Sequence, residues 1–425
     1  MRSYTMFTPQ EMQEIKEQFY YVDKDIHDKP RLYFDNAGGS FRLKRAEQVF
    51  HEIDAIPDCS ERHHQMALYL QEIEECGRQD ARIIFNAADG AIYPVYTASQ
   101  LMFDLVRVIS ENAGGSNMVT SILEHPSAFD AISYYAQYTH CELRVARSNP
   151  LTGGVDAEEV ISLIDKETAI LSVMAASNIS GYIYDIETIV KRAREINPDI
   201  YIIIDAVQHA PHGVLDVQKL NIDAMNFAPY KFFGVRGFSL AYVSDRVAAL
   251  AHHKLAGKSA ADWELGSPAP AHYAALTAIV DYVCSLGMKT ASGQDDRRAL
   301  FVAGMNRIAE HERGLLDTLL NGTEKTPGLR NMNGVEVCVD NPNLDERDLI
   351  IGIAFDNLPC EVAVREYEKK NVIVYERSSS SLYSHRMVKS FGLDGMVRVS
   401  PLHCNSVEDI EAFLDITRQL TALTC

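Results

Sequence analysis

The sequence contains no run of apolar residues that approaches the roughly 18 needed for a membrane-spanning helix. It is also short of basic residues, since 40 lysines and arginines stand against 59 aspartates and glutamates, which gives a formal net charge of −19. Binding to a phosphate backbone requires a basic surface, so a nucleic acid is not expected as a partner. Residues 1–17 include Glu11, Glu14 and Glu17 and lack the apolar segment of a signal peptide. We therefore expect a cytoplasmic protein that binds neither membranes nor nucleic acids.

The cysteines lack the spacing of metal-binding or redox motifs. The chain has 8 cysteines, which are scattered along it, and no two of them form a Cys-x-x-Cys pair. This distribution is typical of reduced thiols in a cytoplasmic protein and argues against a disulfide framework or a zinc site. Internal repeats and low-complexity segments are also missing from the sequence. We expect a protein without a metal site.

What the sequence does contain is an alternation of predicted strands and helices. Strands are expected at 117–122, 169–173, 201–204 and 238–243, and the continuous apolar run at 201–204 is typical of a strand buried on both faces. Segments with apolar residues at helical spacing separate most of them. Strands that alternate with helices form a largely parallel sheet with helices on both faces. The sequence therefore predicts an α/β fold.

With 425 residues, the chain is long enough for one large and one smaller domain. We expect a large domain at 32–290 and a small α+β domain at 291–425, with residues 1–31 packed against the small domain. Residues 376–389, which include the run Ser378 to Ser381, are expected to form a polar, mobile loop. The other elements predicted for the small domain are a long helix over 295–320, strands at 334–339, 360–364, 372–375 and 396–400, and a last helix over 406–422.

Lys231 is the most informative residue of the sequence. It follows a short strand predicted at 223–227, and aromatic residues flank it on both sides. A buried ammonium group is costly unless it is paired or loses its charge, and forming a Schiff base with an aldehyde removes the ammonium. Enzymes that use pyridoxal phosphate (PLP) need such a lysine, together with an acid that keeps the pyridine nitrogen protonated. Asp205, at the end of the strand predicted at 201–204, suits the second role.

Other polar residues also follow predicted strands. His125, Asn178 and Gln208 each come shortly after one. In a parallel sheet, ligands bind beyond the carboxyl ends of the strands. We therefore expect these side chains to meet Asp205 and Lys231 at one rim of the sheet.

An earlier segment combines small residues with a predicted change of structure. A strand is expected at 82–85, a tight turn at 86–91 and a helix over 92–111. A turn of small residues before a helix N-terminus binds anions through backbone N–H groups and the helix dipole. The turn is either a phosphate site or an ordinary connection between a strand and a helix.

Together these segments resemble the class V aminotransferase family of fold-type I PLP enzymes. That family includes cysteine desulfurases, selenocysteine lyase, isopenicillin epimerase and kynureninase. The resemblance extends from Leu32-Tyr-Phe-Asp-Asn36 to Val397-Arg-Val-Ser400. Its most specific part is the pair Asp205-x-x-Gln208 with Lys231 further along the chain. It implies the fold of these enzymes and PLP as the cofactor.

The resemblance implies a role for each matching position. Lys231 would carry the cofactor, Asp205 would pair with the pyridine nitrogen, and His125 would stack on the ring; these are the expected catalytic residues. The other implied cofactor contacts are Ala88, Asp89 and Gly90 in the phosphate-binding turn, Asn178 and Gln208 near the phenolic oxygen, Tyr230, and Gly266 and Ser267. The last pair resembles a contact to the phosphate of a neighbouring subunit, which implies a homodimer with shared active sites. Arg398 would bind the substrate carboxylate in a bidentate manner, and Asn36 and Tyr375 are the further expected substrate residues.

The sequence departs from the family pattern in three places. The family often has Ser-x-His-Lys at the lysine, whereas this chain has Ala228-Pro-Tyr-Lys231. The Gly-Pro-x-Gly that usually follows reads Gly234-Val-Arg-Gly237. Cysteine desulfurases carry a nucleophilic cysteine on a C-terminal loop, but residues 376–390 contain none. Cys404 is the cysteine nearest in sequence to Arg398, and we expect it to be a small buried residue.

We therefore expect a PLP-dependent enzyme that acts on a small α-amino acid. The favoured reaction is β-elimination by a C–S or C–Se lyase, because no desulfurase cysteine is visible. A class V aminotransferase is the alternative, and an epimerase or a non-catalytic PLP-binding relative is a second one. In PLP enzymes, loss of the Cα proton gives a carbanion that can lead to elimination, transamination or racemisation. The residues around the substrate therefore decide which reaction follows.

Overall fold

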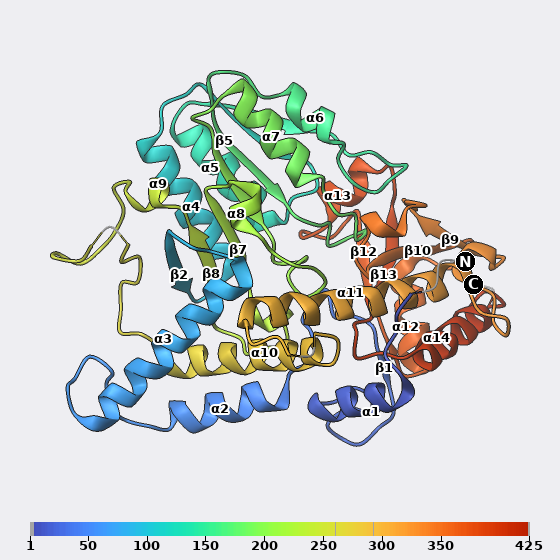
Figure 1. The fold of residues 1–425 in the computed structure, drawn as a ribbon. Coiled ribbons are helices and arrows are strands. Elements are labelled where there is room, and N and C mark those ends of the chain that lie inside the picture. The colour runs from blue at the N-terminus through green and yellow to red at the C-terminus, as the bar shows by residue number, and fades with distance from the viewer. Residues whose placement is uncertain (1–3, 260, 292, 424–425) are drawn as a thin grey trace.

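The computed structural model describes residues 4–259, 261–291 and 293–423 (Figure 1). A 7-stranded sheet lies at its centre, in the order β2-β8-β7-β6-β5-β3-β4. These strands are β2 (Ala91–Val95), β3 (Asn117–Ser121), β4 (Glu142–Ala146), β5 (Thr168–Met174), β6 (Tyr201–Asp205), β7 (Ala224–Phe227) and β8 (Ser239–Val243). Only β8 runs against the others, since it pairs antiparallel with both β2 and β7. The predicted α/β fold with a largely parallel sheet is confirmed.

The inner strands of this sheet are buried on both faces. Successive residues of a strand point to opposite faces, and β6 follows this rule. Ile203 packs into a cluster with α4 (Ala98–Asn112) and α5 (Pro126–Tyr138). Ile202 and Ile204 pack into the main core with residues of α7 (Ile186–Ile196), α10 (Pro270–Met288) and α11 (Arg297–Asn321). Burial on both faces explains why these strands are continuous apolar runs.

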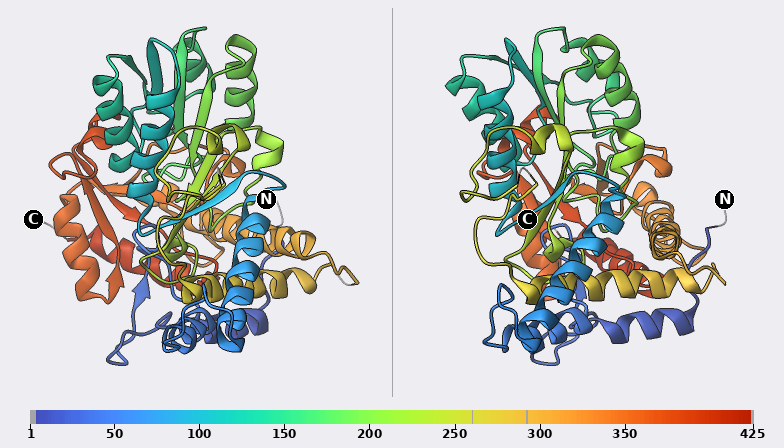
Figure 2. Two further views of the ribbon diagram at one scale, coloured as in Figure 1. Left: turned by 90° about the vertical axis from the view of Figure 1, so that its left-hand side faces the viewer. Right: turned by 60° about the vertical axis from the view of Figure 1, so that its left-hand side comes forward.

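A second, smaller sheet holds the C-terminal part of the chain. Its antiparallel order is β12-β13-β10-β9. Its strands are β9 (Val335–Cys338), β10 (Ile351–Phe355), β12 (Tyr375–Ser378) and β13 (Gly395–Val399). Helices α12 (Cys360–Lys369) and α14 (Val407–Leu420) pack with α11 against this sheet (Figure 2). Strand β1 (Leu32–Tyr33) pairs with β11 (Val372–Ile373) and so joins the start of the chain to this unit.

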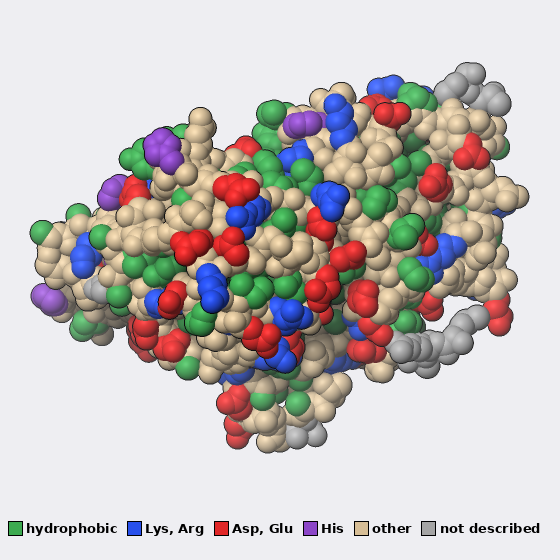
Figure 3. Space-filling view, turned by 90° about the horizontal axis from the view of Figure 1, so that it is seen from above, with side chains coloured by type: hydrophobic (Ala, Val, Ile, Leu, Met, Phe, Trp, Pro, Cys, Tyr) green, Lys and Arg blue, Asp and Glu red, His purple; other side chains and the backbone are tan. Residues whose placement is uncertain are grey.

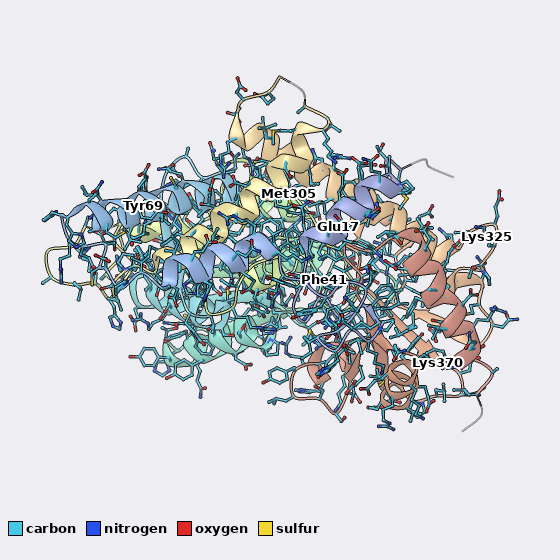
Figure 4. The ribbon with its side chains drawn as sticks, turned by 90° about the horizontal axis from the view of Figure 1, so that it is seen from below. Glu17, Phe41, Tyr69, Met305, Lys325 and Lys370 are labelled. Atoms are coloured by element: carbon cyan, nitrogen blue, oxygen red, sulfur yellow. The ribbon has the colours of Figure 1, made fainter. Side chains whose placement is uncertain are left out.

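The N-terminal part of the chain lies beneath both sheets. Helix α1 (Pro9–Gln18) is tied to α14 by an ion pair between Lys16 and Asp409 at 2.9 Å. Seen from below, Glu17 and Phe41 lie between Tyr69 at one end of the molecule and Lys325 and Lys370 at the other (Figure 4). The remaining elements are α2 (Lys44–Asp54), α3 (Gln65–Phe85), α6 (Ala157–Ser162), α8 (Val217–Leu220), α9 (Asp245–Ala248), α13 (His385–Ser390), η1 (Pro229–Lys231), η2 (Leu329–Asn331) and η3 (Leu344–Glu346). The division into domains at 31 and 290 stays a prediction.

The strand predicted at 82–85 is wrong, because these residues form the last turn of α3. Asn86 ends that helix in the left-handed conformation, with φ 56°. The chain then forms β2, and α4 begins only after Thr97, whose side chain accepts a hydrogen bond from Gln100 N at 3.1 Å. Short apolar runs do not distinguish a strand from a buried helix segment. The turn at 86–91 therefore connects a helix to a strand.

Two predictions for the small domain are also wrong. Residues 360–364 are the first half of α12 and not a strand. Residues 376–389 form an ordered segment that consists of β12, a short turn and α13. Ser384 lies in that turn, where its hydroxyl donates to Ser378 O at 2.9 Å and accepts from Ser378 N at 3.2 Å. These two hydrogen bonds hold the chain in a turn between β12 and α13.

No helix of the described residues is long and apolar enough to cross a membrane. On the face seen from above, acidic and basic side chains are interspersed (Figure 3).

Candidate active site

The predicted polar residues do meet at one rim of the central sheet. Asp205 is the last residue of β6, and Lys231 ends the 3₁₀ turn η1 that follows the neighbouring strand β7. His125, Asn178 and Gln208 follow β3, β5 and β6. All of them line a cavity of about 310 Å³. This volume is within the range of small-molecule binding sites.

Lys231 is buried in this cavity. Burial lowers its pKa to about 8, and the positive charge of Arg398 acts in the same direction, while Asp205 opposes both. Its Nζ lies 3.4 Å from Gln208 Oε1, to which it donates a long hydrogen bond. A lysine with this pKa has a substantial neutral fraction near neutral pH, so its amine can act as a nucleophile or a base.

Asp205 lines the same cavity and is also buried. Burial raises its pKa, whereas the N–H of Val207, which donates to Oδ1 at 3.1 Å, and the charge of Lys231 lower it. A cation bound beside this carboxyl group would favour its ionised form. The protonated nitrogen of a pyridine ring is such a cation.

His125 presents an uncharged ring to the same cavity. It is the N-cap of α5, where its Nδ1 accepts a hydrogen bond from Ser127 N at 3.3 Å. Burial lowers its pKa to about 3, and the charges of Lys231 and Arg377 act in the same direction. The ring is therefore neutral at physiological pH and suited to stacking on another flat ring.

The remaining groups of the cavity fit PLP. Asn178 is buried, and its Oδ1 has no hydrogen-bond partner among the described residues, so a bound ligand could satisfy it. Thr97, Ala98 and Ser99 line the cavity where α4 begins. The first N–H groups of that helix and its dipole favour a phosphate there. A reactive lysine, a buried acid, a neutral ring and an anion site thus occur together.

The predicted phosphate turn lies elsewhere. Asp89 accepts a hydrogen bond from the hydroxyl of Tyr242 at 3.1 Å, and Gly90 N donates to Asp245 at 3.2 Å. Together with Ala88, these residues precede β2, whereas the cavity lies beyond the other end of that strand. The prediction placed the helix N-terminus one strand too early, and the phosphate contacts of Ala88, Asp89 and Gly90 stay a prediction. The capping pattern of Thr97 before an apolar helical segment was the signal that could have located it.

Gly266 and Ser267 are also absent from the residues that line the cavity of their own chain. They border a separate hollow, in which Ser267 Oγ donates to Glu61 Oε1 at 2.5 Å. Whether they reach a neighbouring subunit stays a prediction.

A smaller recess of about 220 Å³ adjoins the cavity and shares His125, Asn178, Tyr230 and Lys231 with it. Arg398, on β13, lines this recess, as does Tyr375. The Arg398 guanidinium donates to Asp35 Oδ1 at 2.7 Å and to Asn178 O at 3.2 Å. Asp35 and Arg377 also line the recess. The sequence had not identified either of them as a site residue.

Asn36 is not among the residues that line the recess, and its contact with the substrate stays a prediction. Its amide nitrogen donates to Ser400 O at 3.1 Å, and its amide oxygen accepts from Phe41 N at 3.2 Å. The side chain thereby holds two distant backbone segments together. The recess is lined instead by its neighbours Asp35, Ala37 and Gly38.

Cysteines are not found among the described residues that line the cavity or the recess. Cys404 is buried with 0% of its surface exposed, as expected, and its sulfur lies 3.7 Å from His403 Nε2. Burial raises the pKa of its thiol well above the usual value, and the charge of Glu312 acts in the same direction. This thiol is therefore a poor nucleophile.

Known proteins of similar sequence are cysteine desulfurases. A probable cysteine desulfurase of Borreliella burgdorferi is 23% identical over 94% of this chain and 94% of its own length. One from Streptomyces coelicolor is 26% identical over 74% of this chain and 77% of its own.

Solved structures of similar fold carry the same description. A cysteine desulfurase from Thermococcus onnurineus covers 99% of both chains with a TM-score of 0.81 and 19% identity. The cysteine desulfurase CsdA from Escherichia coli has a TM-score of 0.80 and 17% identity, and covers 99% of this chain and 100% of its own. These structures share the fold-type I architecture.

The family model described as "Aminotransferase class-V" matches residues 32–413, which include every residue that lines the cavity and the recess. This chain therefore belongs to the class V aminotransferase family and is a PLP-dependent enzyme.

Proposed function

We propose that this enzyme removes sulfur or selenium from a small α-amino acid by β-elimination, without a catalytic cysteine. The observation that carries the proposal is the packing of residues 378–390 beside the recess. Arg386, on α13, donates to Glu124 O at 2.6 Å and to Ile122 O, and its guanidinium lies 3.8 Å from the centre of the Phe129 ring. A desulfurase needs a thiolate on a mobile loop. Here the corresponding segment is anchored and bears Tyr383 at the recess.

The buried residues of the cavity have distinct parts in this proposal. Lys231 would carry the cofactor, and its pKa of about 8 suits its amine to take the proton from the substrate Cα. Asp205 would keep the pyridine nitrogen protonated, and His125 would stack on the ring. When bound, PLP supplies an electron sink for the pair left at Cα. The bond from Cβ to sulfur then breaks, sulfur leaves as hydrosulfide, and the remaining fragment hydrolyses to pyruvate and ammonia.

We also propose how the cavity holds the two ends of the cofactor. Asn178 and Gln208 would face the phenolic oxygen, whose hydroxyl form would donate to the unpartnered Oδ1 of Asn178. Thr97 and Ser99, at the start of α4, would hold the phosphate. The hydroxyl of Tyr230 takes the place of the histidine that often precedes the lysine in this family.

The active form in this proposal is a homodimer with shared sites. Tyr96, at the mouth of the cavity, is 72% exposed in the single chain, and a partner subunit would cover it. Gly266 and Ser267 are exposed in the single chain and do not line their own cavity, so a second chain can reach them. Tyr69 and Leu265 are further exposed apolar residues. A partner subunit that covers these side chains would remove their apolar surface from water.

A screen of amino acids tests the reaction. The purified enzyme with PLP is mixed with single amino acids, the cofactor absorbance is followed, and the products of the responding substrates are identified. We expect a response to sulfur or selenium amino acids, with pyruvate and ammonia as products. A keto acid with its side chain intact, together with the pyridoxamine form of the cofactor, would instead identify an aminotransferase.

A further inference from the structure

Two amide side chains of the cavity are held only weakly by contacts of their own. Gln208 makes one side-chain hydrogen bond among the described residues, the long one of 3.4 Å from Lys231 Nζ. Because a lysine can only donate, this bond directs Gln208 Oε1 towards Lys231 and leaves Nε2 as the atom that can donate to a ligand. Asn178 Oδ1 has no partner among these residues. The directions of both amides therefore depend on how the backbone that carries them is held.

Asp348 contacts the turn that carries Gln208. This residue lies between η3 and β10 and is 4% exposed. Its carboxylate lies beside His209, the residue after Gln208, and His209 Nδ1 is 2.9 Å from Oδ2 and 3.2 Å from Oδ1. An ionised carboxylate only accepts hydrogen bonds, so Nδ1 is the donor. Asp348 thereby anchors the chain next to Gln208.

A glycine leaves the space that the His209 ring occupies. A Cβ on Gly213 would collide with His209 Nε2 and would lie 2.5 Å from Cε1. The backbone also closes around this residue, since His209 O accepts from His212 N at 2.9 Å and from Gly213 N at 3.1 Å. The ring is therefore held between Gly213 on one side and Asp348 on the other.

The backbone of Asp348 contacts the turn that carries Asn178. Its N–H donates to Gly181 O at 2.8 Å. Gly181 has φ 76°, and a Cβ there would lie 2.6 Å from the carbonyl oxygens of Asp348 and Ile350. Only a glycine permits this conformation together with so close an approach. Asp348 thus contacts both of the turns that present the two amides.

We propose that His209 and Asp348 are positioning residues that direct Gln208 and Asn178 towards the phenolic oxygen of PLP. Neither His209 nor Asp348 is among the described residues that line the cavity, so both act through the two turns. The inference rests on the proposed placement of the cofactor, but it does not depend on the reaction that follows.

The charge of Asp348 also acts on a second pair. Burial lowers the pKa of His212, and the charges of Glu312 and Asp348 both raise it. A substitution of Asp348 would therefore disturb this pair as well. Variants of His209 and Gly213 leave the carboxylate of Asp348 in place, so they test the positioning more specifically.

The absorbance of the lysine-bound cofactor gives a readout that does not require turnover. It changes with pH as the nitrogen that joins Lys231 to PLP loses its proton. A negative phenolic oxygen favours the protonated nitrogen, and a hydrogen bond donated by Gln208 Nε2 would disperse that charge and lower the midpoint pH. Gln208→Ala should therefore raise the midpoint by roughly one unit, the size of one hydrogen bond to a charged group.

Variants of the anchor should act in the same direction. His209→Leu should raise the midpoint by roughly half a unit or more, and His209→Asn, whose side-chain nitrogen can replace Nδ1, should return it towards the wild-type value. Gly213→Ala keeps His209 but displaces its ring, so it should also raise the midpoint.

Arg297→Leu is the matched control, because it likewise takes the 2.7 Å partner away from a buried carboxylate, that of Asp80. It should lower the stability in denaturant unfolding and leave the midpoint unchanged.

The outcomes separate the positioning from the placement of the cofactor. A midpoint that rises in Gln208→Ala, but stays at the wild-type value in both His209→Leu and Gly213→Ala, would overturn the inference and retain the proposed place of Gln208. An unchanged midpoint in Gln208→Ala would overturn both. If His209→Leu does not fold, Gly213→Ala decides. An enzyme that forms no pyruvate can still show the predicted shifts, so failure of the proposed reaction is a separate result.

Discussion

Lys231 and Asp205 share a buried cavity, and each influences the ionisation of the other. The negative charge of Asp205 raises the pKa of Lys231 against the larger effect of burial, and the charge of Lys231 lowers that of Asp205 in turn. Binding a protonated pyridine nitrogen beside Asp205 would replace the lysine as its counter-charge. The two residues therefore suit different roles in the proposed reaction. Lys231 acts as the base, and Asp205 holds the pyridine ring of PLP.

Replacing Asp205 by asparagine tests this division. The amide has nearly the same shape, so the fold should be retained, but it cannot keep the pyridine nitrogen protonated. We expect kcat to fall by about a hundredfold or more, on the scale of other proton-positioning groups. Circular dichroism and the absorbance of bound PLP would confirm that the variant is folded and loaded. Activity within a few-fold of wild type would show that another acid has this role.

Single residues at strand ends were predictable, whereas residues placed by packing were not. Lys231, Asp205 and His125 follow apolar strands, and the direction of parallel strands brings them together. The burial of Arg377 depends on how β12 pairs with β13, which no local pattern reveals. Asp35 was not identified as a site residue, because its partner Arg398 is far away in the sequence.

At the scale of elements, a buried ion pair links the segment after β6 to α11. His212 Nδ1 lies 2.6 Å from Glu312 Oε2, and both side chains are buried. Burial alone would lower the pKa of His212, but Glu312 outweighs it and raises the pKa from 6.5 to about 9. The charged form of His212 is thus favoured in the folded state. Glu312 also accepts a hydrogen bond from His403 N at 2.9 Å, so it joins three segments.

This pair predicts a pH dependence of stability. Because the folded pKa of His212 is higher than the unfolded one, the stabilisation is complete below about pH 6.5 and is lost as the pH rises through about 9. Glu312→Gln should lower the free energy of unfolding by about 3 kcal/mol, since it leaves the histidine buried without its partner. Denaturant unfolding at several pH values measures both effects. A wild-type stability that does not fall between pH 6.5 and 9 would contradict this account.

Long helices with a regular spacing of apolar residues were predicted correctly, whereas two short apolar segments were assigned to the wrong kind of element. The helices expected over 295–320 and 406–422 are present as α11 and α14. Residues 82–85 and 360–364 are apolar segments too short for their period to separate a strand from a helix. In both places the surrounding helix decides the conformation.

At the scale of the whole molecule, the site lies where the two sheets meet. The central sheet supplies the cavity with Lys231 and Asp205, and the smaller sheet supplies Arg377 and Arg398. A movement of one unit against the other would therefore change the recess and leave the cavity largely intact.

The exposed mouth of the cavity predicts a homodimer. Light scattering of the PLP-loaded enzyme should give twice the chain mass, and dilution to monomers should weaken PLP binding, because the partner is expected to contribute Gly266 and Ser267. Tight binding of PLP by a monomer would contradict the shared site.

The central claim is elimination without a catalytic cysteine, and the products formed from L-cysteine test it most directly. The measurement compares wild-type enzyme with Cys404→Ala, because Cys404 is the cysteine nearest in sequence to Arg398 among the described residues. Pyruvate, ammonia and sulfide at unchanged rates in both proteins are the predicted result. Alanine as the product, abolished by Cys404→Ala, would contradict the account.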